Sequence, residues 1–223
     1  MTQNKAYSRV SHRVNAFLDS DIIVRKCLLK NIISLRALSR YIIQKLELEQ
    51  KNLDAVISAI RRYKKTGKED AQEKILRRLF SGVAVKTRSE VVDIKINKNK
   101  KSLDGISRLN SIIDIEKGEI VRIIQAEQSI TVVIDYKNLE KFYNIFGKSN
   151  YISVDKGLVE VNLQFTEEAQ HVKGIIALVT STLNAEGVNI VEIMSCAPEL
   201  LLIVKKGELL KVLNVVNNIS EYV

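Results

Sequence analysis

The sequence is poor in the residues from which many catalytic and metal sites are built. Its 223 residues include two cysteines, two histidines, one proline and no tryptophan. Cys27 and Cys196 are too few for a disulfide framework or a cysteine-rich metal site. His12 and His171 stand in no Ser/His/Asp, Cys/His or metal-ligand spacing. The sequence therefore predicts a protein that is not an enzyme and that uses neither a metal ion nor another cofactor.

Long apolar runs are also missing. No segment approaches the roughly 20 apolar residues that span a bilayer, and the first residues lack the apolar stretch of a secretory signal. A composition of 46% hydrophobic and 27% charged residues is typical of globular proteins. We therefore expect a cytoplasmic protein without a membrane partner.

The positive charge is concentrated at one end of the chain. Residues 1–82 carry 18 Lys and Arg against 8 Asp and Glu, whereas residues 83–223 carry 17 against 18. A basic excess confined to one segment favours a polyanionic partner over a general surface property. The alternative is a helical surface that simply faces solvent.

An internal repeat runs through the second segment. The apolar residues from Ile120 onward match those from Ile190 onward at an offset of 70, without a gap. Upstream the offset is 69, and Gly105 then matches Gly174. Few residues are identical, but the apolar positions keep step throughout. We interpret the pattern as a duplication.

Both copies have the same order of expected elements. An alternating strand is followed by a helix, a two-stranded hairpin and a second short helix, which form an antiparallel sheet covered by helices. We therefore predict an α+β protein with a helical domain over residues 1–82, a first repeat over 83–150 and a second over 151–223. A short extra strand at 83–87 precedes the first copy. Another at 151–154 either opens the second copy or closes the first.

The second copy resembles an ACT domain of the aspartokinase type. The likeness lies in Gly174 at a strand–helix turn, Leu183 and Gly187 near the helix end, the strand entry at 188–190, and the polar break at 195–199. It extends over roughly residues 83–219, with the first copy as a weaker version. The resemblance implies two ferredoxin-like ACT repeats with antiparallel sheets. It also implies a homodimer or another homo-oligomer that binds an amino acid, without the kinase domain.

The turn before Gly174 is the expected ligand site. A strand ends and a helix begins there, so free backbone N–H groups attract a carboxylate and glycine lets a ligand approach closely. The expected ligand-binding residues are Phe165, Thr166, Val172, Lys173, Gly174, Ile175, Asn189, Ile190 and, in the first copy, Gly105. The alternative is that both glycines only permit close packing of helix on sheet.

The basic segment is predicted to be helical. Its expected helices lie at about 7–18, 20–30, 34–46, from 52 onward, and 69–80. The third and fourth are separated by a short gap, which predicts a helix-turn-helix whose second helix enters the major groove of DNA. On that helix Val56, Ile57 and Ile60 are expected inside, whereas Ala55 is expected outside. The expected DNA-binding residues are Arg36, Arg40, Ser58, Arg61, Arg62 and Lys65.

The stretch from Ala37 to Lys65 also resembles the DNA-binding helices that precede ACT domains in uncharacterised archaeal proteins. Together the patterns predict a ligand-responsive transcriptional regulator that binds DNA and senses an amino acid or a similar small anion. Two alternatives remain: a non-catalytic regulatory or scaffolding subunit that binds a protein through its helical domain, and an RNA-binding protein.

Overall fold

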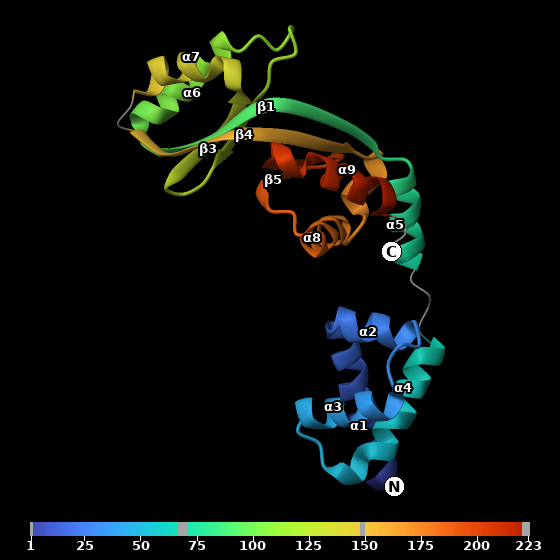
Figure 1. Ribbon diagram of the computed structural model, residues 1–223. Coiled ribbons are helices and arrows are strands. Elements are labelled where there is room, and N and C mark those ends of the chain that lie inside the picture. The colour runs from blue at the N-terminus through green and yellow to red at the C-terminus, as the bar shows by residue number, and fades with distance from the viewer. Residues whose placement is uncertain (1, 67–70, 148–149, 220–223) are drawn as a thin grey trace. The chain divides into compact units, whose positions relative to one another are not determined.

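The computed structural model describes residues 2–66, 71–147 and 150–219 (Figure 1). The chain divides into two compact units, Met1–Glu73 and Lys74–Val223. The boundary between the two units therefore falls within the fifth helix, near its start, whereas the sequence placed a boundary after residue 82. We describe each unit separately.

The N-terminal unit is helical. Its elements are α1 (Thr2–Ser20), α2 (Ile22–Leu29), α3 (Leu35–Lys45), the 3-10 turn η1 (Gln50–Asn52) and α4 (Leu53–Thr66). The Ser34 side chain caps α3 as expected, because it accepts a hydrogen bond from the Ala37 N–H at 3.4 Å. The second helix is capped by Asp21, and not by Ser20. The unit has its own core, which includes Val14, Leu18, Leu28, Leu38, Ile42, Val56 and Ile60.

The C-terminal unit combines helices with one antiparallel sheet, which confirms the α+β class. Its elements are α5 (Ala71–Ser81), β1 (Ala84–Asn97), α6 (Lys100–Ile112), β2 (Val121–Gln125), β3 (Ser129–Asp135), η2 (Tyr136–Asn138), α7 (Leu139–Phe146), β4 (Tyr151–Gln164), η4 (Glu167–His171), α8 (Ile175–Ala185), β5 (Ile190–Cys196), β6 (Glu199–Lys205), η5 (Lys206–Glu208) and α9 (Leu209–Asn218). The strand order is β2-β3-β1-β4-β6-β5. The separate sheets expected for two repeats are thus one continuous sheet.

The two long central strands, β1 and β4, belong to both ends of this sheet (Figure 1). We call residues 91–155 the first lobe, and residues 74–89 together with 158–219 the second lobe. Tyr151 and Val154 pair with β1 and pack in the core of the first lobe, so the strand at 151–154 closes that lobe. The early part of β1 instead pairs with the end of β4 and contributes Val85 to the core of the second lobe.

A bulge in each central strand allows this sharing. Glu90 has φ 57° and Gly157 has φ 70°, and the register of β1 with β4 shifts at both positions. One extra residue exchanges the two faces of a strand. On β1, Val85 and then Val92 therefore both point towards helices, although one number is odd and the other even.

Each lobe has a separate core. In the first lobe α6 and α7 cover β1 and β3 through Leu109, Phe142 and Phe146. In the second lobe α8 and α9 cover β4 and β6. The fifth helix, α5, joins this second core through Leu76, Leu79 and Phe80, because its apolar residues lie on one side at helical spacing. From Lys74 onward this helix therefore belongs to the C-terminal unit, whereas the sequence grouped it with the helical segment.

Candidate functional site

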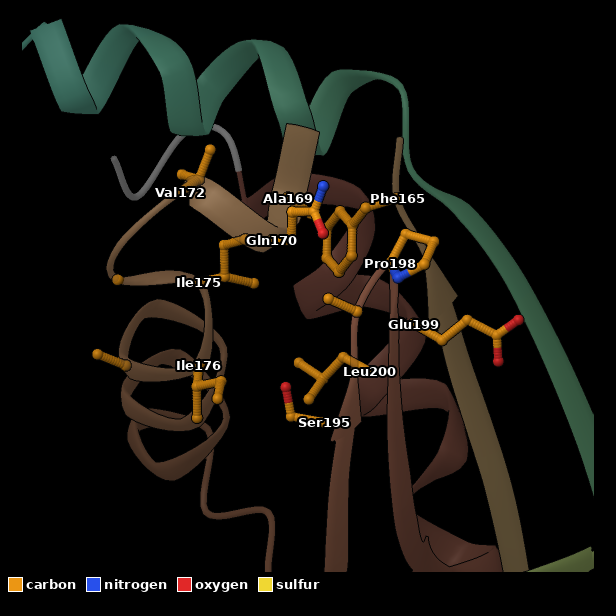
Figure 2. A pocket seen from close by; sticks show the side chains of 13 residues that line it. Phe165, Ala169, Gln170, Val172, Ile175, Ile176, Ser195, Pro198, Glu199 and Leu200 are labelled. Carbon is orange, nitrogen blue, oxygen red and sulfur yellow. The ribbon is translucent and has the colours of Figure 1, made fainter. Parts of the chain in front are cut away.

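The second lobe contains a pocket of about 550 Å³ that opens to solvent (Figure 2). It lies at the end of the lobe where β4 gives way to α8 and where the β5–β6 hairpin turns. Its walls are Phe165, Ala169, Gln170, Val172, Gly174, Ile175, Ile176, Ala177, Ser195, Ala197, Pro198, Glu199 and Leu200. Pockets of this size hold small molecules.

The chain between β4 and α8 forms one wall. Residues Glu167–His171 form the short 3-10 turn η4, which ends before the helix can begin. Gly174 follows in the left-handed conformation with φ 89°, which an L-residue adopts only with strain. Helix α8 starts only after this glycine. The helix entrance is thereby set back from the end of β4, and the pocket lies in the space between them.

The β5–β6 hairpin forms the opposite wall. The backbone N–H of Phe165 donates to the carbonyl of Pro198 at 2.9 Å, which ties the end of β4 to the hairpin turn. Leu200 is 2% exposed and forms the floor, and Ser195 points its hydroxyl into the open space (Figure 2). The only proline of the sequence thus has a structural place at the rim.

Polar groups in the pocket are few. Within the described residues no side chain caps α8, so the N–H groups of its first turn, from Ile175 to Ala177, remain available for a ligand or water. The carboxylate of Glu199 accepts hydrogen bonds from the amides of Asn162 and Gln164, both at 3.0 Å. Figure 2 shows this carboxylate turned away from the pocket.

Helix α5 contacts the outside of the same wall. The ring of Phe80 meets the ring of Phe165 edge to face, with centroids 5.2 Å apart. Arg78 Nη2 lies 2.7 Å from Glu168 Oε2 on η4. A change in the position of Phe165 or η4 would therefore change the contacts of α5.

Sequence reasoning located part of this pocket. Of the expected ligand-binding residues, Phe165, Val172, Gly174 and Ile175 line it. Thr166 and Lys173 are exposed neighbours that are not part of its walls.

Asn189 and Ile190 lie elsewhere. They are at the start of β5, at the opposite end of that strand from the pocket; the Asn189 N–H faces Glu208 at 3.4 Å, and Ile190 packs against the core. The hairpin wall was missed as a binding element, although the polar break at 195–199 and the lone Pro198 marked its position.

Gly105 has a different role from Gly174. It does not open a helix, because α6 begins at Lys100, where Asn99 and Ser102 form a capping box. A Cβ at Gly105 would stand 2.5 Å from Phe146 Cε1. This glycine permits α6 and α7 to approach each other, and the structure places it against an aromatic side chain, away from the pocket.

The expected DNA-binding residues lie on two helices of the N-terminal unit. Arg36 and Arg40 on α3 and Arg61 and Arg62 on α4 are exposed, and Arg62 Nη2 donates to Ser11 Oγ at 3.4 Å. Ser58 is half-buried, and the side chain of Lys65 lies outside the described residues.

The inner face of α4 differs from the expected one. Ala55 is buried rather than exposed, and Ala59 joins Val56 and Ile60 in the core, whereas Ile57 is only half-buried. Positions 55 and 59 lie one turn apart on the stripe that faces the bundle. Residues 46–52 link α3 to α4, which is longer than the turn of about three or four residues in a helix-turn-helix.

The described part of the chain contains neither a candidate membrane-spanning helix nor a candidate metal site. No helix there is long and apolar enough to cross a membrane. No group of three or more His, Cys, Asp or Glu side chains there is arranged to hold a metal ion.

Comparison with known proteins gives structural relatives only. No protein family matches the sequence, and no curated protein is similar to it. The aspartate kinase of Clostridium acetobutylicum superposes with a TM-score of 0.50 at 19% identity, over 61% of this chain and 34% of that enzyme. The chain thus spans about a third of that enzyme.

Two further solved structures are similar to this chain at low sequence identity. The aspartokinase alpha and beta subunits give a TM-score of 0.50 at 15% identity, over 63% of this chain and 98% of that one. The regulatory subunit of aspartate kinase from Thermus thermophilus gives 0.48 at 14% identity, over 60% and 94%. Identities this low speak for the fold alone. The matched part of the chain has a fold that also occurs in part of the Clostridium acetobutylicum aspartate kinase and in an aspartokinase subunit.

Proposed function

We propose that the chain is a ligand-responsive regulator that binds DNA through its N-terminal unit and senses a small molecule in the pocket of its second lobe. The two lobes are two ACT-type repeats in this interpretation, and the assembly is a homodimer. The protein has no catalytic role. Neither copy of an ACT pair needs a catalytic role, because such modules change the activity of the domain that is attached to them.

The contact between α5 and the pocket wall carries this proposal. Phe165 lines the pocket on one side and meets Phe80 of α5 on the other. Helix α5 is also the element through which the chain runs back to the N-terminal unit. A ligand that moves Phe165 or η4 changes the packing of α5, and this gives the ligand a direct connection to the segment that joins the two units.

The charge of the N-terminal unit supports a nucleic-acid partner. Residues 1–73 carry 15 Lys and Arg against 8 Asp and Glu, a net charge of +7, whereas residues 74–223 carry 20 against 18. Arg36, Arg40 and Arg61 are exposed on α3 and α4. Arginine contacts the phosphate backbone and the guanine edge, which makes these residues suitable for DNA.

Fluorescence anisotropy with labelled duplex DNA tests the proposal. We expect binding at low salt, with the logarithm of the association constant falling by about 0.9 per tenfold increase in salt for each phosphate contacted. The triple variant Arg36→Ala, Arg40→Ala, Arg61→Ala should bind at least about tenfold more weakly. The matched control removes exposed lysines of the C-terminal unit, Lys141→Ala and Lys211→Ala, and should bind like the wild type.

Two outcomes would select another function, and a third would change the proposed assembly. Binding to single-stranded or duplex RNA in preference to DNA would favour an RNA-binding protein. No nucleic-acid binding at low salt would favour the regulatory or scaffolding subunit that contacts a protein through α3 and α4. A monomer by light scattering would remove the homodimer.

The coupling between the two sites is tested by reciprocity. A ligand that changes the affinity for DNA must have its own affinity changed by DNA by the same factor. The variant Phe80→Leu, which weakens the contact with Phe165, should reduce this factor while the protein still binds both partners. An unchanged factor would mean that α5 does not carry the coupling.

A further inference from the structure

We propose that the pocket selects a small carboxylate with an apolar side chain, either an apolar amino acid or its keto acid, and rejects ligands with charged side chains. This inference rests on the proposed function, since it assumes that the pocket is the ligand site.

The floor and sides of the pocket are apolar. Leu200, Ala169 and Ile175 are buried and belong to the lobe's hydrophobic core, and Phe165 and Val172 pack against the same core. An apolar ligand side chain would extend this core and gain about 25 cal/mol for each Å² of its area removed from water.

A charged ligand side chain would find no partner on these walls. Glu199 is the only ionisable residue among the lining side chains, and its two carboxylate oxygens are engaged by Asn162 and Gln164. It also points away from the cavity (Figure 2). A charged group at the end of the ligand's side chain would thus lose part of its hydration without gaining an ion pair from the described lining residues, and such a loss is costly.

The entrance of α8 supplies a feature that prefers an anion. Gly174, Ile175, Ile176 and Ala177 are all lining residues, so the start of the helix is itself a wall of the cavity. The N–H groups of the first turn and the positive end of the helix dipole favour a carboxylate there. Gln170 and Ser195 add hydrogen-bonding groups beside the same space. The ligand's acid group would lie at α8 and its side chain on the Leu200 floor.

Isothermal titration of the full chain tests the ligand class. The probes are L-leucine, L-isoleucine, L-phenylalanine, the keto acid of leucine, leucinamide, L-lysine and L-aspartate. We expect at least one apolar acid to bind at least about tenfold more tightly than lysine or aspartate. Leucinamide lacks the carboxylate and should bind at least about tenfold more weakly than leucine. The keto acid shows whether the amino group is needed.

Two alanines of α8 give a matched pair of variants. Ala177→Trp places a large ring in the cavity, whereas Ala185→Trp places the same ring on the exposed last turn of the helix. The first should abolish binding and the second should leave it unchanged, with equal thermal unfolding of both. A third variant, Ile176→Lys, adds a cation to a wall residue that is 46% exposed. It should shift the preference towards aspartate.

The possible failures are distinguishable. Tight binding of lysine or aspartate that Ala177→Trp abolishes would overturn the ligand class and leave the proposed sensing function intact. Binding that survives Ala177→Trp would place the site elsewhere. Equal binding of leucine and leucinamide would remove the carboxylate contact. If no apolar acid binds at millimolar concentration, the inference is wrong, whereas the DNA measurements decide the rest of the proposed function independently.

Discussion

The two lobes of the C-terminal unit have the same order of elements, but their first covering helices begin differently, and the pocket described above lies at the helix entrance of the second lobe. At the sequence offset of 69, Asn99 and Ser102 of the first lobe correspond to Glu168 and His171 of the second. The first pair forms a capping box that starts α6 at Lys100. The second pair forms no such box, and η4 replaces the first turn of the helix. A difference in helix capping thus accompanies the different helix entrances of the two lobes.

The cores of the two lobes also differ in the size of their side chains. Phe142 and Phe146 stack with centroids 4.2 Å apart in the first lobe, and their counterparts at an offset of 70 are Val212 and Val216. Large aromatic side chains fill the first lobe up to Gly105. The same order of elements therefore packs around stacked aromatic rings in the first lobe and around smaller aliphatic side chains, beside a pocket, in the second.

The largest expected effect on stability comes from removing a large aromatic side chain from the core of the first lobe. Phe146→Ala should lower the free energy of unfolding by about 3–5 kcal/mol, because the side chain is buried against Phe142 and α6. Val216→Ala at the equivalent position should cost clearly less, since fewer atoms are removed. Chemical denaturation monitored by circular dichroism measures both. Equal losses would contradict the view that the aromatic pair supports the first lobe.

The next effect probes the close approach at Gly105. Gly105→Ala should destabilise the protein by about 1–3 kcal/mol, because the new methyl group would overlap Phe146. Gly118→Ala is the control: nothing lies within 4 Å of its Cβ, and its φ of 74°, unlike that of Gly105, is positive, so any loss there comes from backbone strain and not from overlap. A second change, Phe146→Leu, should recover part of the loss in the Gly105 variant and none in the Gly118 variant.

The two central strands that the lobes share carry a buried acid. Asp93 on β1 stands opposite Asp155 on β4, is 3% exposed, and has one carboxylate oxygen without a partner among the described residues. Burial is the main cause that raises the pKa of Asp93 from 3.8 to about 6, with Glu192 and Asp155 acting in the same direction and Lys95 against them.

Because the folded state holds this proton more tightly than the unfolded chain, Asp93 contributes stability that appears as the pH falls from about 7 to 4. The size is on the order of 3 kcal/mol, at about 1.4 kcal/mol for each unit of the pKa difference. Asp93→Asn should therefore be more stable than the wild type at pH 8, with a difference that shrinks towards pH 5. Thermal denaturation at several pH values measures this. A variant with the same pH dependence as the wild type would show that Asp93 is not the titrating group.

A smaller effect should come from the capping box itself. Asn99→Ala removes the side chain that accepts the Ser102 N–H at 2.9 Å, which should cost about 1 kcal/mol. Glu168→Ala, at the matching place in the second lobe, breaks a solvent-exposed ion pair with Arg78 and should cost less than about 1 kcal/mol. If both changes cost the same, capping does not explain the different helix starts.

The sequence predicted the broad organisation because that depends on local and periodic patterns. Alternating residues such as Val92, Ile94 and Ile96 form the strands expected of them, and Ser34 caps α3. Four of the expected ligand residues line the pocket because they flank a glycine whose left-handed backbone begins a helix. The hairpin wall was missed because its proximity to Phe165 arises only through pairing of β4 with β6.

The sequence by itself determined which segments are helices or strands, that the sheet is antiparallel, and that the basic charge lies at one end, since each follows from residue type and spacing. The tertiary structure decided that β1 and β4 are shared between the lobes and that α5 belongs with the second lobe. It also decided that Gly105 meets a phenylalanine whereas Gly174 borders a cavity. These outcomes depend on which distant residues share a volume, and no local pattern specifies that.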